Sequence, residues 1–248
     1  MRVAALIPAL NEERSVGDAV RRLRMAGVPR VVVVDNGSTD QTTEVARAAG
    51  AQVVREERRG YGRACLAGMA HLQADPPDAL LFMDADLSDV PEEAALLLSP
   101  LSRDHADLVI GSRVLGEAEG RAERGSLTPP QRFGNALSCW LLWHLYGVPA
   151  TDLGPFRAIR WDALMRLGLT DQDFGWNVEM QIKAARQRLR VMEVAVSYRT
   201  RKTGTSKISG DIRGTVKAGT KILYTVARLR GSPVGHAAGG VGEQPWRR

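Results

Sequence analysis

Cysteine and histidine are scarce in this chain of 248 residues, and their scarcity excludes several classes of protein. Two cysteines, Cys65 and Cys139, cannot build a disulfide framework or a zinc site by themselves, so we expect a reducing compartment. The four histidines are scattered without the spacing of metal ligands. No run reaches the ~18 uninterrupted apolar residues of a membrane span, and no signal peptide precedes the first expected strand. We therefore expect a cytoplasmic protein, either soluble or attached peripherally to the inner face of the membrane.

Excess positive charge is absent from most of the chain. Residues 1–198 hold 23 basic and 26 acidic side chains, whereas residues 199–230 hold nine basic side chains against one acidic. A formal net charge of +6 could suggest a nucleic-acid-binding module, but here the charge gathers in one segment and no known DNA-binding motif occurs. The pattern argues against nucleic acid and favours an anionic partner met at one place.

Short apolar runs alternate with helical periodicity along the first half of the chain. A hydrophobic content of 44% and a charged content of 25% are typical of a globular protein. This alternation predicts an α/β fold with a mostly parallel sheet flanked by helices. Residues 115–130 are polar and hold two prolines, which predicts a long mobile loop. The expected strands are 2–7, 31–34, 51–54, 80–83, 107–111, 152–159 and 191–198, and the later expected helices are 132–146 and 177–187.

The sequence predicts three units: a catalytic domain over residues 1–207, a basic amphipathic helix over 208–230 and a disordered tail over 231–248. Such a helix can lie in a membrane interface, or it can pack on the domain with a solvated basic face. A predicted aromatic helix with Trp140, Trp143 and Tyr146 favours the membrane. The helical wheel separates two groups: apolar Ile208, Ile212, Val216, Ile222, Leu223, Val226 and Leu229, and basic Arg213, Lys217, Lys221 and Arg228.

An acidic tripeptide, Asp84-Ala85-Asp86, directly follows an expected apolar strand. Ligands of open parallel sheets bind beyond the carboxyl ends of the strands, so both carboxylates point to a site. Two carboxylates one residue apart repel each other unless a cation neutralises them, and hard divalent ions such as Mg²⁺ or Mn²⁺ take oxygen ligands. The alternative is an acidic turn that caps the next helix.

Two further motifs follow the first two expected strands. Asp35 ends the second strand, where its carboxylate can accept hydrogen bonds from a base or a ribose, and Gly37 permits the sharp turn after it. Asp40 of this motif can equally cap the following helix. The first strand leads into Asn11 and Glu12, for which the alternative is a turn with an acid at a helix start.

Together these motifs resemble the family 2 glycosyltransferases of the GT-A fold. The resemblance rests on P-A-L-N-E (8–12), V-D-N-G-S-T-D (34–40), D-A-D (84–86), G-S-R (111–113), T-D-L-G-P-F-R (151–157) and R-K-T-G-T-S-K (201–207). It covers about residues 2–210, and within the family the chain looks most like the dolichyl- and polyprenyl-phosphate sugar synthases. Asn36 and Ser88 depart from the family pattern, which often has Asp and Gln at these positions.

The resemblance implies a role for each matching position. Pro8, Asn11, Glu12 and Asp35 would line the nucleotide base and ribose. Asp84, Ala85 and Asp86 would belong to the donor site, the two acids holding Mg²⁺ or Mn²⁺ on the donor diphosphate. Arg113, Arg201 and Lys207 would meet the diphosphate or an acceptor phosphate.

The reaction implied is a metal-dependent, inverting transfer of a hexose from a UDP- or GDP-sugar to a polyprenyl phosphate at the membrane surface. An ionised phosphate acceptor needs no strong base, whereas a hydroxyl acceptor does, and Asp152 and Glu179 are the candidates. Glu179 can instead cap its helix. The alternatives are a soluble or hydroxyl acceptor, or a nucleotidyltransferase, which would be expected to carry a glycine-rich phosphate loop that residues 8–14 lack.

Overall fold

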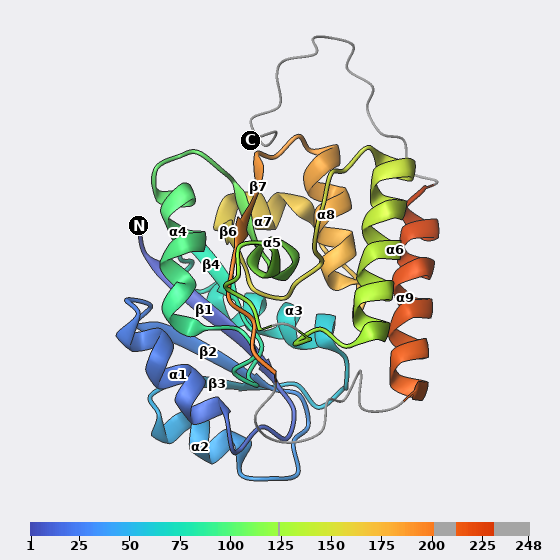
Figure 1. Ribbon diagram of the computed structural model, residues 1–248. Coiled ribbons are helices and arrows are strands. Elements are labelled where there is room, and N and C mark those ends of the chain that lie inside the picture. Colours follow the sequence, from blue (N-terminus) through green and yellow to red (C-terminus); the bar gives the residue numbers. More distant parts are fainter. Residues whose placement is uncertain (124, 201–211, 231–248) are drawn as a thin grey trace.

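A seven-stranded mixed sheet forms the centre of the protein in a computed structural model, which describes residues 1–123, 125–200 and 212–230, with side chains from 219 onward in the last segment (Figure 1). The strand order is β3-β2-β1-β4-β6-β5-β7, and only β6 runs antiparallel to its neighbours among the described strands. The strands are β1 (Val3–Ala9), β2 (Arg30–Asp35), β3 (Gln52–Arg55), β4 (Ala79–Phe82), β5 (Leu108–Ser112), β6 (Arg157–Arg160) and β7 (Val191–Ala195).

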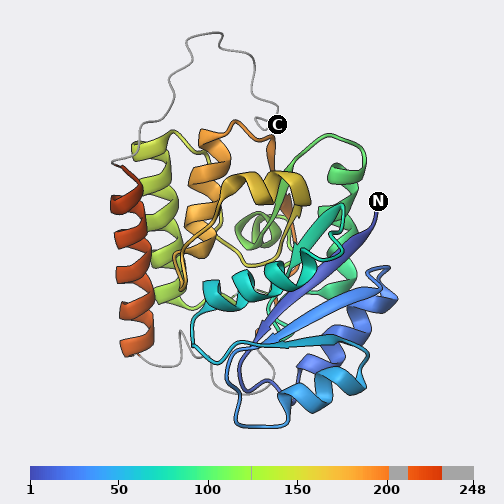
Figure 2. The same ribbon diagram turned by 180° about the vertical axis from the view of Figure 1, so that it is seen from behind.

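Two hydrophobic cores hold helices against the two faces of the sheet (Figures 1 and 2). Helices α1, α2 and α4 share one core with the sheet, and α3, α7 and α8 share the other. The helices are α1 (Val16–Met25), α2 (Thr42–Ala48), α3 (Tyr61–Leu72), η1 (Pro91–Glu93), α4 (Ala94–Ser102), α5 (Arg113–Ala118), α6 (Pro129–Tyr146), α7 (Trp161–Leu167), α8 (Trp176–Arg186) and α9 (Ile212–Arg230). Because β1 and β2 are buried on both faces, their sequences are apolar runs without alternation.

The predicted α/β class with a mostly parallel mixed sheet is confirmed, and the differences are local. Residues 113–118 form α5, although most of this stretch was expected to lie in a mobile loop. The proline pair at the end of that stretch begins α6: Pro129 is its first residue, and Thr128 and Gln131 form a capping box. Strand β6 begins only at Arg157, and α7 follows it without a predicted counterpart.

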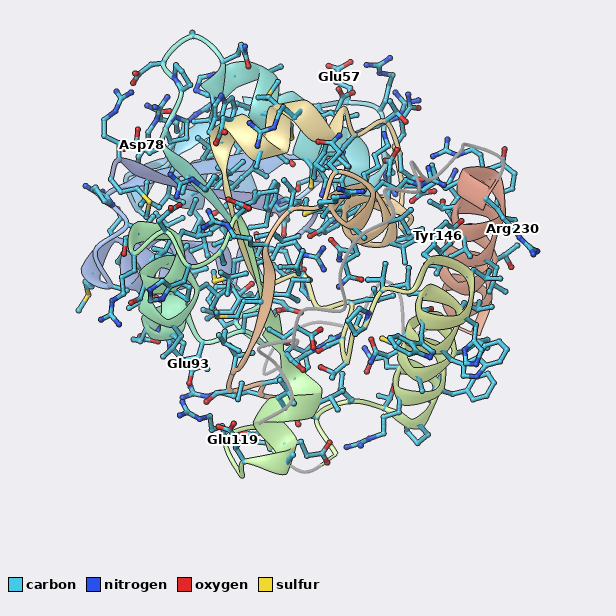
Figure 3. All side chains as sticks on the ribbon, turned by 90° about the horizontal axis from the view of Figure 1, so that it is seen from above. Glu57, Asp78, Glu93, Glu119, Tyr146 and Arg230 are labelled. Carbon is cyan, nitrogen blue, oxygen red and sulfur yellow. The ribbon has the colours of Figure 1, made fainter. Side chains whose placement is uncertain are left out.

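Helix α9 packs beside α6 and α8 in a third layer, away from the sheet (Figures 1 and 2). Val226 and Leu229 are buried against Leu142 and Ile182 in a separate small core. Tyr146 and Arg230, the last residues of α6 and α9, lie at the same end of this layer (Figure 3). Part of the apolar face that the sequence suggested for a membrane is therefore occupied by the protein itself.

Polar contacts also fix α9 to the domain. The Thr225 hydroxyl donates to Asp171 Oδ2 at 2.9 Å, and the Tyr146 hydroxyl donates to the Val226 carbonyl. Arg228 lies 3.7 Å from a Glu179 carboxylate oxygen. Within the described ranges, no helix is both long enough and apolar enough to cross a bilayer.

Candidate active site

The candidate site lies where β1, β2, β4 and β5 end. Asp35 is the last residue of β2, Asp84 follows β4 by two residues, and Arg113 directly follows β5. Because β6 runs antiparallel, the segment before it returns to the same edge and carries Asp152 there. Side chains far apart in the sequence thus meet at one end of the sheet, as parallel strand topology dictates.

Asp84 and Asp86 are electrostatically coupled. Burial, and then the negative charge of Asp86, raise the pKa of Asp84 to about 7, while the Arg113 guanidinium acts in the opposite direction. Asp86 Oδ1 accepts a hydrogen bond from the Ser88 backbone N–H at 3.0 Å, and Ala85 between the two acids is buried. The pair is therefore a local concentration of negative charge that a cation would relieve.

Asp89 is a third acid at this place, and sequence reasoning missed it. It is 1% exposed, and among the described residues neither carboxylate oxygen has a hydrogen-bond partner. Burial, followed by the charges of Asp84 and Asp86, raises the pKa of Asp89 well above its usual range. The available signal was its position three residues after Asp86, at the end of the same strand–turn segment. An orphaned buried carboxylate is costly, so it points to a missing positive partner.

Arg113 is held by Asp152 through a bidentate ion pair. Nε donates to Asp152 Oδ2 at 2.8 Å, Nη2 donates to Oδ1 at 2.7 Å, and the Arg113 backbone N–H donates to Oδ2 at 2.8 Å. The guanidinium carbon stands 5.0 Å from the centre of the Tyr198 ring. Although burial opposes it, the Asp152 charge raises the pKa of Arg113, so this cation is permanent. Asp152 is fully buried and its two oxygens are committed to Arg113.

Glu179 lies at the start of α8 and has a different set of partners. Its carboxylate accepts hydrogen bonds from the backbone N–H groups of Thr170 and Asp171, at 3.0 and 2.7 Å, and pairs with Lys183 at 2.9 Å. Burial alone would raise the pKa of Glu179, but the hydrogen bonds from Lys183 and the backbone outweigh it and lower that pKa. The structure therefore places Glu179 in the anchoring of loop 170–171, whereas Asp152 contacts Arg113.

The β1 and β2 motifs interlock by hydrogen bonds. Asp35 accepts from the Ser38 backbone N–H and from the Thr43 hydroxyl, both at 2.9 Å. Asn11 has a positive φ of 52°, and its Oδ1 accepts from the Thr39 backbone N–H at 2.8 Å. These contacts bring the loop after β1 against the loop after β2.

Pro8 and Glu12 belong to the same corner. Pro8 pairs in register with Val34 of β2, and Glu12 Oε2 accepts from the Ser15 hydroxyl at 2.9 Å. Arg201 and Lys207, the remaining predicted phosphate contacts, lie outside the described residues. All the other predicted donor-site residues are therefore brought to one edge.

Asn36, a departure from the family pattern, has a structural explanation. Its Nδ2 donates to the carbonyl oxygens of Glu56 and Arg58, at 3.0 and 2.9 Å, and its Oδ1 accepts from the Gly60 backbone N–H at 2.8 Å. An amide supplies both the donor and the acceptor that this loop requires, whereas an ionised carboxylate is an acceptor only.

A divalent cation fits the chemistry of the acidic cluster. No three His, Cys, Asp or Glu side chains of the described parts of the chain converge as a complete metal cage. Mg²⁺, however, is commonly held by one or two carboxylates together with substrate phosphates. The raised pKa of Asp84 and the orphaned oxygens of Asp89 both show negative charge without a sufficient counter-charge. The residues fit a metal that arrives with an anionic ligand.

Comparison with known proteins identifies the family to which a chain with this fold and this edge belongs. The model of glycosyl transferase family 2 matches residues 4–160. The chain belongs to this family, and it is a glycosyltransferase of the hexosyltransferase class. The resemblance seen in the sequence motifs is thereby confirmed.

Several relatives carry descriptive names. An uncharacterized glycosyltransferase of Mycobacterium tuberculosis is 40% identical over 217 residues, which are 87% of this chain and 94% of the relative. The undecaprenyl-phosphate mannosyltransferase of Micrococcus luteus is 34% identical and is covered to 90%, against 86% of this chain. The dolichyl-phosphate hexose transferase of Haloferax volcanii is 30% identical and is covered to 83%, against 80% of this chain.

Solved structures confirm the GT-A-type fold. Glucosyl-3-phosphoglycerate synthase from Mycobacterium tuberculosis, in complex with Mn²⁺, uridine diphosphate and glucosyl-3-phosphoglycerate, superposes with a TM-score of 0.73. The match covers 94% of this chain and 81% of that chain at 21% identity, and at that identity it shows the fold alone.

Proposed function

We propose that this enzyme transfers a hexose from a UDP- or GDP-sugar to a polyprenyl phosphate at the membrane surface, with inversion at the anomeric carbon and with the help of Mg²⁺ or Mn²⁺. The observation that carries the proposal is the pairing of an acidic cluster with one partly buried, permanent cation. Asp84, Asp86 and Asp89 lie on one side, and Arg113, clamped by Asp152, lies beside them.

The hydrogen bonds of Asp152 favour an acceptor that needs no protein base. Its oxygens accept three hydrogen bonds from Arg113, so this carboxylate serves to position the guanidinium. A phosphate monoester has a second pKa of ~6, so it is already ionised at neutral pH and attacks without a protein base. Arg113 Nη1 has no hydrogen-bond partner in the described ranges, and this nitrogen can meet an acceptor or donor phosphate.

On the donor side, the site must stabilise the negative charge that develops as the bond to C1 of the sugar breaks. The leaving nucleoside diphosphate gains negative charge, and Arg113, with Arg201 and Lys207 from the segment outside the described residues, would stabilise it. Asp84 and Asp86 would hold the metal, which when bound supplies Lewis-acid stabilisation of that charge. Asp35 and Asn11 would orient the base and ribose from the neighbouring loops.

The names of two relatives support a lipid-phosphate acceptor. The Micrococcus luteus protein is called an undecaprenyl-phosphate mannosyltransferase and the Haloferax volcanii protein a dolichyl-phosphate hexose transferase. A cytoplasmic enzyme that uses such an acceptor would work on the inner face of the membrane. No nucleic acid enters the proposal.

A soluble acceptor is the second candidate. The mycobacterial neighbour glucosyl-3-phosphoglycerate synthase was solved with phosphoglyceric acid, a soluble molecule that carries a phosphate, and Arg113 Nη1 could bind such a phosphate as well. A nucleotidyltransferase is disfavoured because the chain belongs to glycosyl transferase family 2.

The test is nucleotide release by the purified full-length protein with Mn²⁺ and a panel of UDP- and GDP-sugars. Each donor is offered alone, with undecaprenyl phosphate in detergent, and with phosphoglyceric acid. Release of UDP or GDP that requires the lipid, together with a lipid-linked hexose of inverted configuration, supports the proposal. Release of UDP or GDP that requires only phosphoglyceric acid supports the soluble acceptor instead. Release of a nucleoside monophosphate contradicts both acceptor proposals, because a glycosyltransferase releases the nucleoside diphosphate.

A further inference from the structure

Exposed aromatic side chains gather on one side of the protein. Phe133, Trp140, Trp143 and Tyr224 are all the exposed aromatic side chains of the described residues, and every one of them lies on α6 or α9. Their exposed fractions run from 52% to 71%, which is far above what a packed core aromatic shows. Such a concentration of exposed apolar surface indicates an interaction site.

The α6 face, defined here as Phe133, Trp140 and Trp143, follows helical spacing. Phe133 and Trp140 are seven residues apart, and Trp143 follows by three, so the three side chains lie along one side of the helix. The opposite side of α6 is packed: Cys139 and Leu142 are buried. The helix therefore has one face in the protein and one aromatic face that the described part of the chain leaves exposed.

The charged side chains near the α6 face favour an anionic partner. The sequences of α6 and α9 contain no acidic residue, and α9 carries five basic residues. Of the neighbouring acids, Asp171 and Glu179 of the domain face Arg228, and Glu117 pairs with Arg132 of α6. Lys221 Nζ lies 5.6 Å from the centre of the exposed Tyr224 ring, and Arg230 is exposed at the end of the layer. Trp side chains with adjoining Lys and Arg, and without carboxylates, complement the headgroup region of an anionic bilayer.

The α6 face is also connected to the candidate site. Asn135, two residues after Phe133, donates to the Thr151 carbonyl at 2.9 Å and accepts from the Leu153 backbone N–H at 3.0 Å. These bonds hold the segment that carries Asp152, the partner of Arg113. A surface that rests on a bilayer through α6 would therefore keep the phosphate-binding cation next to the lipid headgroups.

We infer that the α6 face docks this enzyme on an anionic lipid bilayer, with Leu223, Tyr224 and Lys221 of α9 beside it. The surface differs from the one suggested by the helical wheel, because Val226 and Leu229 of α9 are buried against the protein. The inference builds on the proposed function, in which the acceptor is a lipid phosphate, but bilayer binding is measurable without any acceptor.

The experiment is vesicle flotation of the full-length protein with equal parts of phosphatidylcholine and phosphatidylglycerol, without polyprenyl phosphate. The triple variant Phe133→Ala/Trp140→Ala/Trp143→Ala should partition at least about tenfold less than the parent protein, since interfacial binding scales with the apolar area inserted. A matched variant, Met25→Ala/Met165→Ala/Met192→Ala, removes exposed apolar side chains elsewhere and should bind as the parent does. Vesicles of phosphatidylcholine alone should bind the parent more weakly.

Unchanged partitioning of the aromatic variant, with thermal unfolding like that of the parent, overturns the inference. So does a parent protein that does not float but forms a dimer that the aromatic variant loses, because the face then belongs to a second copy of the chain. Activity separates this inference from the proposed function: a short-chain, water-soluble prenyl phosphate should be used equally by the parent and the aromatic variant. If neither protein uses any prenyl phosphate but flotation behaves as expected, the proposed acceptor fails and the docking surface stands.

Discussion

Arg113 and Asp152 form a buried bidentate ion pair, with Nη2 to Oδ1 at 2.7 Å and Nε to Oδ2 at 2.8 Å. The two residues are 39 positions apart and meet because the antiparallel strand β6 returns the chain to the end of β5. The pair fixes a guanidinium close enough to Asp84 to oppose the rise of its pKa, and the proposed function assigns this cation to phosphate.

The first prediction concerns Asp152→Asn. The substitution leaves a largely buried guanidinium, 13% exposed, without its counter-charge, which costs about 3 kcal/mol of unfolding free energy. We expect urea unfolding to show this loss and turnover to fall at least about 100-fold. A general base would behave otherwise: the variant would stay stable and would lose the ionisation from its pH–rate profile. Glu179→Gln is the comparison, and it should reduce stability through loop 170–171.

The second prediction concerns Asp84→Asn and pH. The folded pKa of Asp84 is raised to about 7, so the folded metal-free protein binds a proton that the unfolded chain releases at lower pH. Wild-type stability is therefore lost as pH rises from about 4 to about 7, and Asp84→Asn should remove this dependence. We expect the metal-free variant to melt at a higher temperature than the parent at pH 7.5, with the difference shrinking toward pH 4.

Metal addition should reverse that order. Mn²⁺ with UDP should raise the melting temperature of the parent and leave that of Asp84→Asn almost unchanged. EDTA should return the parent to a melting temperature below that of the variant. A parent protein whose melting temperature and nucleotide release ignore both Mn²⁺ and EDTA would refute the metal assignment.

The third prediction concerns Asp89→Asn. Its carboxylate is buried and has no hydrogen-bond partner within the described parts of the chain, so removing the charge should stabilise the metal-free protein. The same change removes negative potential from the acidic cluster and should weaken Mn²⁺ binding about tenfold, or about 1.4 kcal/mol. Calorimetric titration of Mn²⁺ in the presence of UDP measures it. Asp18→Asn, an exposed acid on α1, is the control and should change neither quantity.

The fourth prediction concerns Asn36→Asp. Its Nδ2 group donates to two carbonyl oxygens of the loop after β3, and a carboxylate would face both of them as an acceptor. We expect a loss of about 2–4 kcal/mol in unfolding free energy, since two hydrogen bonds are replaced by repulsion. A variant as stable as the parent would show that these bonds do not hold the loop.

The fifth prediction concerns Leu229→Ala in α9. Leu229 is 8% exposed in the small core formed with α6 and α8, so its truncation should lower the unfolding free energy by ~2 kcal/mol in a single cooperative transition. Leu223→Ala, on the exposed side of the same helix, should cost little. If Leu229→Ala unfolds like the parent, α9 contributes nothing to the folded domain.

Much of the site could be predicted from local sequence because its acids follow apolar strands directly. Asp35, Asp84 and Asp86 occupy strand ends, and parallel topology brings strand ends together. The loop prediction over 115–130 was wrong at both ends because the capping box at Thr128 and the six-residue helix α5 are short-range features inside a polar stretch. Helix α7 escaped prediction because it is only seven residues long.

The sequence by itself determined the family, the α/β class and the acidic motif, because all three depend on contiguous residues and on their hydrophobic periodicity. Tertiary structure decided the rest. It showed that the Asp152 carboxylate is committed to Arg113, and that Asp89 is buried without a hydrogen-bond partner among the residues described. It also showed that Val226 and Leu229 of α9 are buried against the protein. These facts depend on which side chains meet across long sequence separations, and such meetings follow from strand order and helix packing, which the local sequence does not specify.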